Sequence, residues 1–344
     1  MSRRLVAVVA ALALPAGARA HEAALSRYTY WEDVRPIFEK HCASCHREGG
    51  VGPMSLLEYQ SAVPWSNAIQ LQVLSRTMPP FLPEDGSGPF RGARGLSAEE
   101  LDVLIDWAVG ATPEGEPGDV PSVPLSEAAP EVFLEAGSDV VLTEDEYDET
   151  ECVSFPPLAS TGVLAAMTVR SQSRSVLRRA TLYAGAACAE GAPVLTWLPD
   201  QDRTSFPEGV GWELLAGTKL ALELRYVKGW NEEGARITDR PSLGLWFSPS
   251  GVAVRTQRVE ASEALASGAV EIVALYPDAA AGSDAEPVRI EAVAPDGSVK
   301  PLLVMGAFDR AWREKYFFDA PVRLPAGSRV RVSRPVVWVD FLSE

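Results

Sequence analysis

The chain has 344 residues, enough for two or three domains, and 47% of them are hydrophobic, which is ample for packed cores. Its formal net charge of −16 disfavours nucleic acid and anionic membrane surfaces as partners. It favours a basic protein partner, although a charge that serves only solubility explains the value equally well.

The first twenty residues have the pattern of a secretory signal peptide. Arg3 and Arg4 precede an apolar run over residues 5–14, and Ala18-Arg19-Ala20 forms a small-residue cleavage site. The apolar run is much shorter than the ~20 residues of a membrane span, and no later segment is long enough. We therefore expect cleavage near Ala20, no transmembrane segment and a periplasmic or secreted protein. A buried N-terminal helix is the alternative.

The segment Cys42-Ala43-Ser44-Cys45-His46 is the attachment signature of haem c. Two thiols at this spacing add to the two vinyl groups of one porphyrin, and the adjacent imidazole ligates the iron. A redox dithiol would usually lie on a thioredoxin-like pattern, which is not visible here, and a zinc site would need further Cys or His ligands. We therefore predict one covalent haem on Cys42 and Cys45, with His46 as the proximal iron ligand.

The opposite face of the iron needs a second ligand or stays open, and no histidine follows His46. Met78 lies in Arg76-Thr77-Met78-Pro79-Pro80, where the prolines cannot continue a helix and stiffen the loop. We predict Met78 as the distal ligand, whereas Met54 is expected to pack beside the haem. The alternative for Met78 is a core methionine that fills a gap. Ligation by histidine and methionine favours electron transfer over catalysis.

Residues 21–112 are predicted to form an all-α cytochrome c domain. Apolar residues recur at helical spacing over 31–41 and 64–77. Ser97 and Glu100 form a capping box that opens a helix ending near Gly110. The Pro, Gly, Glu and Ser-rich stretch 113–130 is predicted to be a linker.

Beyond the linker the hydrophobic period changes to two. Leu220, Leu222, Leu224 and Tyr226 alternate with polar or small residues, and the same alternation recurs around 243–247 and 322–332. Short strands separated by turns indicate all-β sandwich domains, jelly-roll-like in class. We predict two, at 131–249 and 250–344.

Two cysteines remain after haem attachment. Cys152 and Cys188 lie far apart in the sequence, and an oxidising compartment favours a disulfide between them. Sequence alone does not supply the geometry that such a bond needs.

The segment Val34-Arg35-Pro36-Ile37-Phe38 before the haem motif, and Met78-Pro79-Pro80-Phe81 after it, resemble a bacterial family of cytochrome c domains. In that family the domain is often fused to a β-rich module similar to the copper type II, ascorbate-dependent monooxygenases of the peptidylglycine hydroxylating type. The C-terminal part of this chain resembles that module in residues 215–220, 224–226, 238–240, 244–247, 312–318 and 324–327. The resemblance implies a retained sandwich scaffold.

The copper ligands of that module are not retained. Its His-His pair corresponds to Arg178-Arg179 in this chain, its His-x-His to Arg225-Tyr226-Val227, and its Pro-His-Met-His to Pro277-Asp278-Ala279-Ala280. Arginine remains protonated and cannot replace imidazole on copper. We therefore do not expect copper. Arg178, Arg179 and Arg225 become candidates for a docking or anion-binding surface; the alternative is that they face solvent or are paired internally.

Three functions are compatible with these patterns. The first is a periplasmic mono-haem electron carrier whose β module docks a redox partner, either a basic protein or a copper-competent relative. The second is a haem- or copper-dependent, monooxygenase-like oxidoreductase acting on a small substrate; the missing histidines disfavour it, and we predict no catalytic residue. The third is a scaffold in which haem only staples a small domain.

Overall fold

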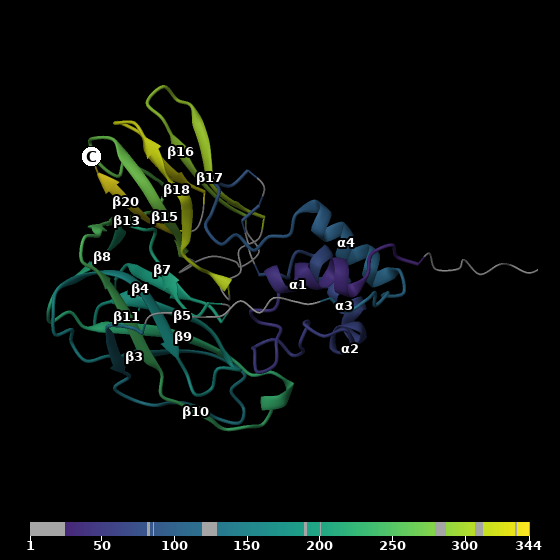
Figure 1. Cartoon of the computed structure of the whole chain (residues 1–344). Coiled ribbons are helices and arrows are strands. Elements are labelled where there is room, and N and C mark those ends of the chain that lie inside the picture. Colours follow the sequence, from purple (N-terminus) through teal and green to yellow (C-terminus); the bar gives the residue numbers. More distant parts are fainter. Residues whose placement is uncertain are drawn as a thin grey trace, which may run out of the picture.

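The computed structural model describes residues 25–80, 83–84, 86–118, 129–188, 191–199, 201–278, 287–306, 312–333 and 336–343. The expected signal peptide, most of the expected linker, and Phe81, Ala279 and Ala280 lie outside these ranges. Figure 1 shows two parts: short helices gather on one side, in the N-terminal module (residues 25–118), and strands form the rest, the β module (residues 129–343).

The helices of the N-terminal module are short. They are a π-helical turn Tyr30–Val34, α1 Arg35–His41, α2 Tyr59–Ala62, a 3₁₀ turn Val63–Trp65, α3 Ser66–Leu74 and α4 Ala98–Val109. Tyr30, Phe38, Leu104 and Trp107 are fully buried in their shared core. The helix α4 begins as expected, because the Ser97 side chain accepts the Glu100 N–H and the Ser97 N–H donates to the Glu100 carboxylate.

The prediction of an all-α cytochrome c domain is wrong. Residues 42–58, 75–80 and 86–97 are mostly turns and irregular backbone, and the α-helices of the module have only 4 to 12 residues. The chain as a whole is mostly β. The helical spacing over 64–77 ends early because the backbone leaves the helix at Leu74 and Arg76 adopts a positive φ.

The first half of the β module consists of two main sheets that enclose one core. One sheet has the order β1-β11-β4-β8-β12 with β7 beside β4, the other has the order β3-β9-β5-β6, and β2 pairs with β10. The strands are β1 Val132–Glu135, β2 Val140–Leu142, β3 Asp148–Ser154, β4 Gly162–Arg170, β5 Leu177–Ala184, β6 Pro193–Trp197, β7 Thr204–Ser205, β8 Val210–Leu214, β9 Leu220–Val227, β10 Ile237–Asp239, β11 Ser242–Ser248 and β12 Val252–Ala253.

The second half repeats this arrangement with sheets β13-β20-β15-β18 and β14-β19-β16-β17 around a second core. Its strands are β13 Arg255–Val259, β14 Ser262–Glu263, β15 Val270–Asp278, β16 Val288–Val293, β17 Val299–Met305, β18 Tyr316–Leu324, β19 Arg329–Val332 and β20 Val336–Ser343. Val273, Ala274 and Phe317 pack into the first core, so the two halves share apolar contacts.

A disulfide joins Cys152 on β3 to Cys188 after β5, with the two Cα atoms 5.9 Å apart. The predicted disulfide between these two cysteines is therefore confirmed. Among the described residues, no helix combines the length and the apolar content that crossing a membrane requires.

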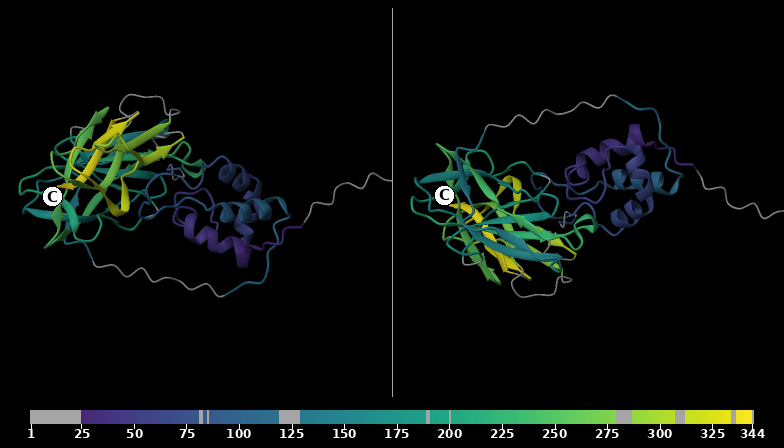
Figure 2. Two further views of the ribbon diagram at one scale, coloured as in Figure 1. Left: turned by 90° about the horizontal axis from the view of Figure 1, so that it is seen from above. Right: turned by 90° about the horizontal axis from the view of Figure 1, so that it is seen from below.

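Part of the N-terminal module is built into the second sandwich. The Glu84 and Gly88 N–H groups donate to carbonyls of Val304 and Leu302 on the edge strand β17, and Phe90 forms a bridge with Phe318 on the edge strand β18. Phe90 is buried in the second core. This segment therefore crosses from the edge of one sheet to the edge of the other and fixes the helices against the β module. Figure 2 shows the helices beside the β module from two further directions.

Candidate functional site

A cavity of about 410 Å³ lies where the N-terminal module meets the β module. This volume falls in the range of about 300–1,000 Å³ that is typical of ligand pockets. The N-terminal module contributes Cys42, Cys45, His46, Met54 and Met78 to its lining. The β module contributes a separate wall, made by Arg178, Leu198, Pro199 and Trp312.

The segment Cys42–His46, called the attachment segment from here on, forms a tight turn at the end of α1. The Cys42 N–H donates to the Phe38 carbonyl and closes the helix, and the His46 N–H donates to the Cys42 carbonyl at 2.8 Å. The Cys45 carbonyl accepts the Gly52 N–H at 2.9 Å. These hydrogen bonds hold both thiols and the imidazole on one side of the cavity.

His46 lies against the backbone of Gly52. A Cβ at Gly52 would be 2.5 Å from Nδ1 of His46, so only glycine permits this approach. The buried Nδ1 has no hydrogen-bond partner among the described residues. Burial lowers the pKa of His46, and the Met54 backbone opposes this shift without reversing it. The lowered pKa favours the neutral imidazole, which is the form that binds metals.

The Cys42 thiol lacks the lowered pKa that is typical of a redox dithiol. Burial, with a smaller contribution from Cys45, raises the pKa of Cys42 to about 12. Dithiol oxidoreductases instead depend on a lowered thiol pKa.

In the described part of the chain, no three His, Cys, Asp or Glu side chains gather in a group that could hold a metal ion. The expectation of a metal-binding site in a cytochrome-like helical domain is therefore wrong. These side chains form no metal centre by themselves.

The methionines divide into two groups. Met54 and Met78 both line the cavity, Met54 from the loop that carries His46 and Met78 from the separate loop after α3. Met167 and Met305 are fully buried in the two sandwich cores and cannot reach it. The structure thus brings the predicted distal ligand to the same cavity as His46.

His41, next to the motif, has a structural role. Its Nδ1 lies 3.0 Å from the Arg94 carbonyl oxygen and its Nε2 lies 3.0 Å from the Glu100 carboxylate. Only the doubly protonated ring donates to both acceptors. Burial would raise the pKa of Glu100, but hydrogen bonds from Ser97, Lys40 and His41 outweigh it and lower the pKa to about 2.

Replacing Glu100 by glutamine is expected to lower the free energy of unfolding by about 1–2 kcal/mol at pH 7, because charge-assisted hydrogen bonds are lost. A carboxyl with a lowered folded-state pKa stabilises the protein above its unfolded pKa of about 4.5 and loses this contribution as the pH falls towards 2. Urea unfolding at pH 7 and pH 3 should therefore show the difference from wild type shrinking in acid. Glu99→Gln, an exposed neighbour on α4, is the control.

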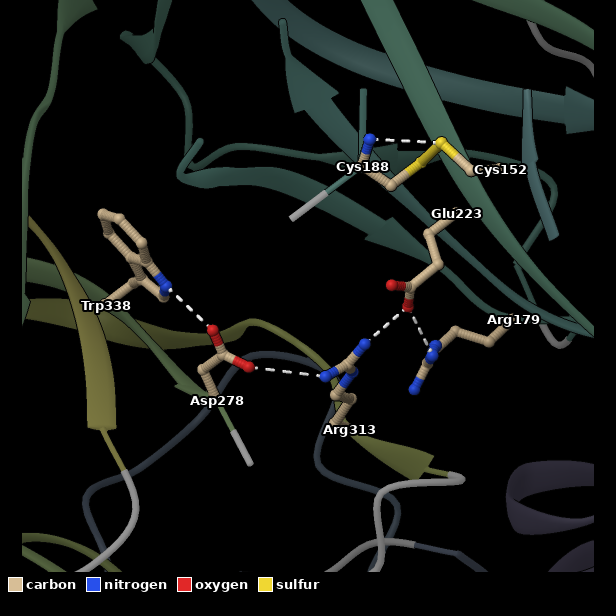
Figure 3. A network of polar contacts seen from close by, with 7 residues as sticks. All are labelled: Cys152, Arg179, Cys188, Glu223, Asp278, Arg313 and Trp338. Carbon is tan, nitrogen blue, oxygen red and sulfur yellow. Dashed lines mark hydrogen bonds and ion pairs between the residues drawn. A yellow bond between two sulfur atoms is a disulfide. The ribbon is translucent and has the colours of Figure 1, made fainter. Parts of the chain in front are cut away.

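A charged network includes Arg179 and Asp278, two positions where the resemblance would place copper ligands (Figure 3). Glu223 accepts hydrogen bonds from Arg179 at 2.7 Å and from Arg313 at 2.5 Å. Asp278 accepts from Arg313 at 3.4 Å and from the Trp338 indole at 3.2 Å. Among the described residues, two cations face two anions. Arg179 and Glu223 belong to the first sandwich and Asp278 and Arg313 to the second, so the network connects the two.

The three candidate arginines have different surroundings. Arg179 belongs to the buried network, and Arg225 makes a two-point ion pair with Asp148 at 2.9 and 2.6 Å. Both are internally paired. Arg178 instead lines the cavity, a location that its sequence position beside a buried arginine does not reveal.

No family model and no curated protein matches this chain. Among solved structures, the major capsid protein P2 from bacteriophage PM2 is 12% identical, with 62% of this chain and 97% of that chain covered and a TM-score of 0.25. A Paenibacillus xanthan lyase is also 12% identical, with 67% and 28% covered and a TM-score of 0.18. Similarities this low carry no argument about fold or function.

Proposed function

We propose that this protein is a periplasmic mono-haem electron carrier with one haem c attached to Cys42 and Cys45. The observation that carries the proposal is the cavity itself: both thiols, the His46 ring and Met78 line one largely apolar space. The close approach of Gly52 to Nδ1 of His46, which leaves Nε2 as the nitrogen available to iron, supports the fit of this group.

Attachment needs only the two cysteines and the haem vinyl groups. Each S–H adds across one C=C bond, so that a C–S bond forms, the π bond is lost and the thiol proton moves to the neighbouring carbon. Nothing is oxidised or reduced. The bound haem would supply a one-electron iron couple, and porphyrin nitrogens would supply the iron ligands that the protein lacks.

The chain's own residues have three roles in this proposal. His46 would bind iron through Nε2, because Nδ1 faces Gly52. Met78 would occupy the opposite position and block access of small substrates to the iron. The apolar lining, including Phe38, Ile69 and Val73, would exclude water and limit rearrangement on electron transfer.

The compartment and the partner form part of the same proposal. The disulfide between Cys152 and Cys188 supports an oxidising location such as the periplasm. The net charge of −16 supports a basic redox partner, with association that weakens as salt is added.

Visible spectra of the haem-loaded protein, oxidised and reduced, test the electron-carrier role. We expect a six-coordinate, low-spin haem that is reduced and reoxidised reversibly without binding carbon monoxide. A five-coordinate, high-spin haem would contradict the proposal and would favour catalysis or ligand sensing.

A further inference from the structure

The cavity is completed by the β module. Leu198 and Pro199 follow β6, Trp312 precedes β18, and Arg178 lies on β5. Apolar side chains and one cation from this module therefore face the attachment segment.

A β-bulge directs Arg178 into the cavity. In the pairing of β5 with β9, Leu177 lies opposite Tyr226 and Arg179 lies opposite Arg225, so Arg178 is the extra residue between them. A bulge bends its strand and re-aims one side chain. Arg179 enters the buried network, whereas its neighbour Arg178 reaches the cavity.

The charge of Arg178 is not balanced by a contact. Arg178 Nη1 donates a hydrogen bond to the Ser175 carbonyl at 2.6 Å, and Arg178 forms no ion pair with the described residues. Burial lowers the pKa of Arg178, and the negative charge of Glu232 opposes this shift. The other arginine in the lining, Arg94, is paired with Glu314 at 2.6 Å.

We propose that Arg178 binds a carboxylate side chain of the haem, so that the β module completes the haem site. This inference rests on the proposed function. A guanidinium carries five donors in a planar fork that matches a carboxylate. The hydrogen bond to the Ser175 carbonyl uses one of these donors. A cation here favours the reduced iron, which carries one positive charge less than the oxidised iron.

Redox titration of the haem-loaded protein tests the pairing. Arg178→Gln should shift the equilibrium with a reference couple about tenfold towards the oxidised form, equivalent to about 59 mV for one electron. Arg178→Lys should keep most of the wild-type potential. The control is Arg240→Gln, which removes the same charge from an exposed pair with Asp139 in the same module and should shift nothing.

Resonance Raman spectra of the same samples separate pairing from a charge acting at a distance. The haem carboxylate bending band should move in both Arg178 variants and stay in place in the control. An unchanged potential in Arg178→Gln, or an unmoved band in Arg178→Lys, overturns the inference while leaving haem attachment intact. A wild-type chain without covalent haem would overturn the proposed function and this inference together.

Discussion

Replacing Lys315 by methionine is expected to lower the free energy of unfolding by about 3–5 kcal/mol. Lys315 Nζ lies 2.6 Å from Asp340 Oδ2, and both side chains are excluded from solvent. Thr256 donates to the other oxygen of Asp340 at 2.7 Å. Burial raises the pKa of Asp340, so the buried environment already disfavours its charged carboxylate. Removing the lysine leaves this carboxylate without its cation.

The position of this pair increases the effect. Lys315 Nζ also lies 5.0 Å from the ring centre of Trp212 on β8, in the first sandwich, whereas Asp340 is on β20 in the second. The variant therefore loses a cation–π contact between the two halves as well as an ion pair.

The double variant Lys315→Met with Asp340→Leu is the control for this prediction. It removes both charges, and we expect it to recover most of the loss, because an apolar pair of similar volume leaves no charge unpaired. Urea unfolding of the wild type, Lys315→Met, Asp340→Leu and the double variant measures the four free energies of unfolding that this comparison needs. Equal destabilisation in the single and double variants would contradict the prediction.

Replacing Met78 by alanine is expected to abolish the weak sulfur-to-iron band at the red edge of the oxidised spectrum. The reduction potential should also fall by on the order of 0.1 V, a fraction of the ~0.8 V range that axial ligands span. The fall has this sign because thioether ligation raises the potential. Absorption spectra and a redox titration of the haem-loaded variant measure both effects.

Met54→Ala is the matched control, because Met54 lines the same cavity from the loop that carries His46. It should keep the sulfur-to-iron band. Loss of that band in Met54→Ala and its retention in Met78→Ala would identify Met54 as the ligand and contradict the account.

Local patterns in the sequence predict local structure well in this chain. The Ser97–Glu100 capping box starts α4 at the expected residue, and Leu220, Leu222, Leu224 and Tyr226 are all fully buried on β9. Each of these features depends on neighbours within a few residues. The pairing of Cys152 with Cys188 follows from compartment and elimination, not from periodicity.

Long-range features could not be predicted in this way. The segment around Phe90 reads as a loop between helices, yet it pairs with two edge strands more than two hundred residues later in the sequence. Arg178 reaches the cavity because of a bulge, which the sequence does not mark. Helical spacing does not reveal where the backbone leaves the helix. The sequence therefore predicts longer helices in the N-terminal module than the structure contains.

The buried arginines of the network between the two sandwiches show why its cations and anions occur together. Arg179 and Arg313 are buried between the sandwiches, and burying either cation alone would be costly. Glu223 and Asp278 compensate them. The network connects the two halves of the β module through these ion pairs.

Mass spectrometry of the denatured, mature chain, produced in cells that attach haem c in the periplasm, tests the central claim most directly. The account predicts a mass increase of one haem in the wild type and no haem in a Cys42→Ala/Cys45→Ala variant. It also predicts that the Cys152–Cys188 bond persists in both proteins. A wild-type chain of unmodified mass, with Cys42 and Cys45 still open to alkylation, would contradict it.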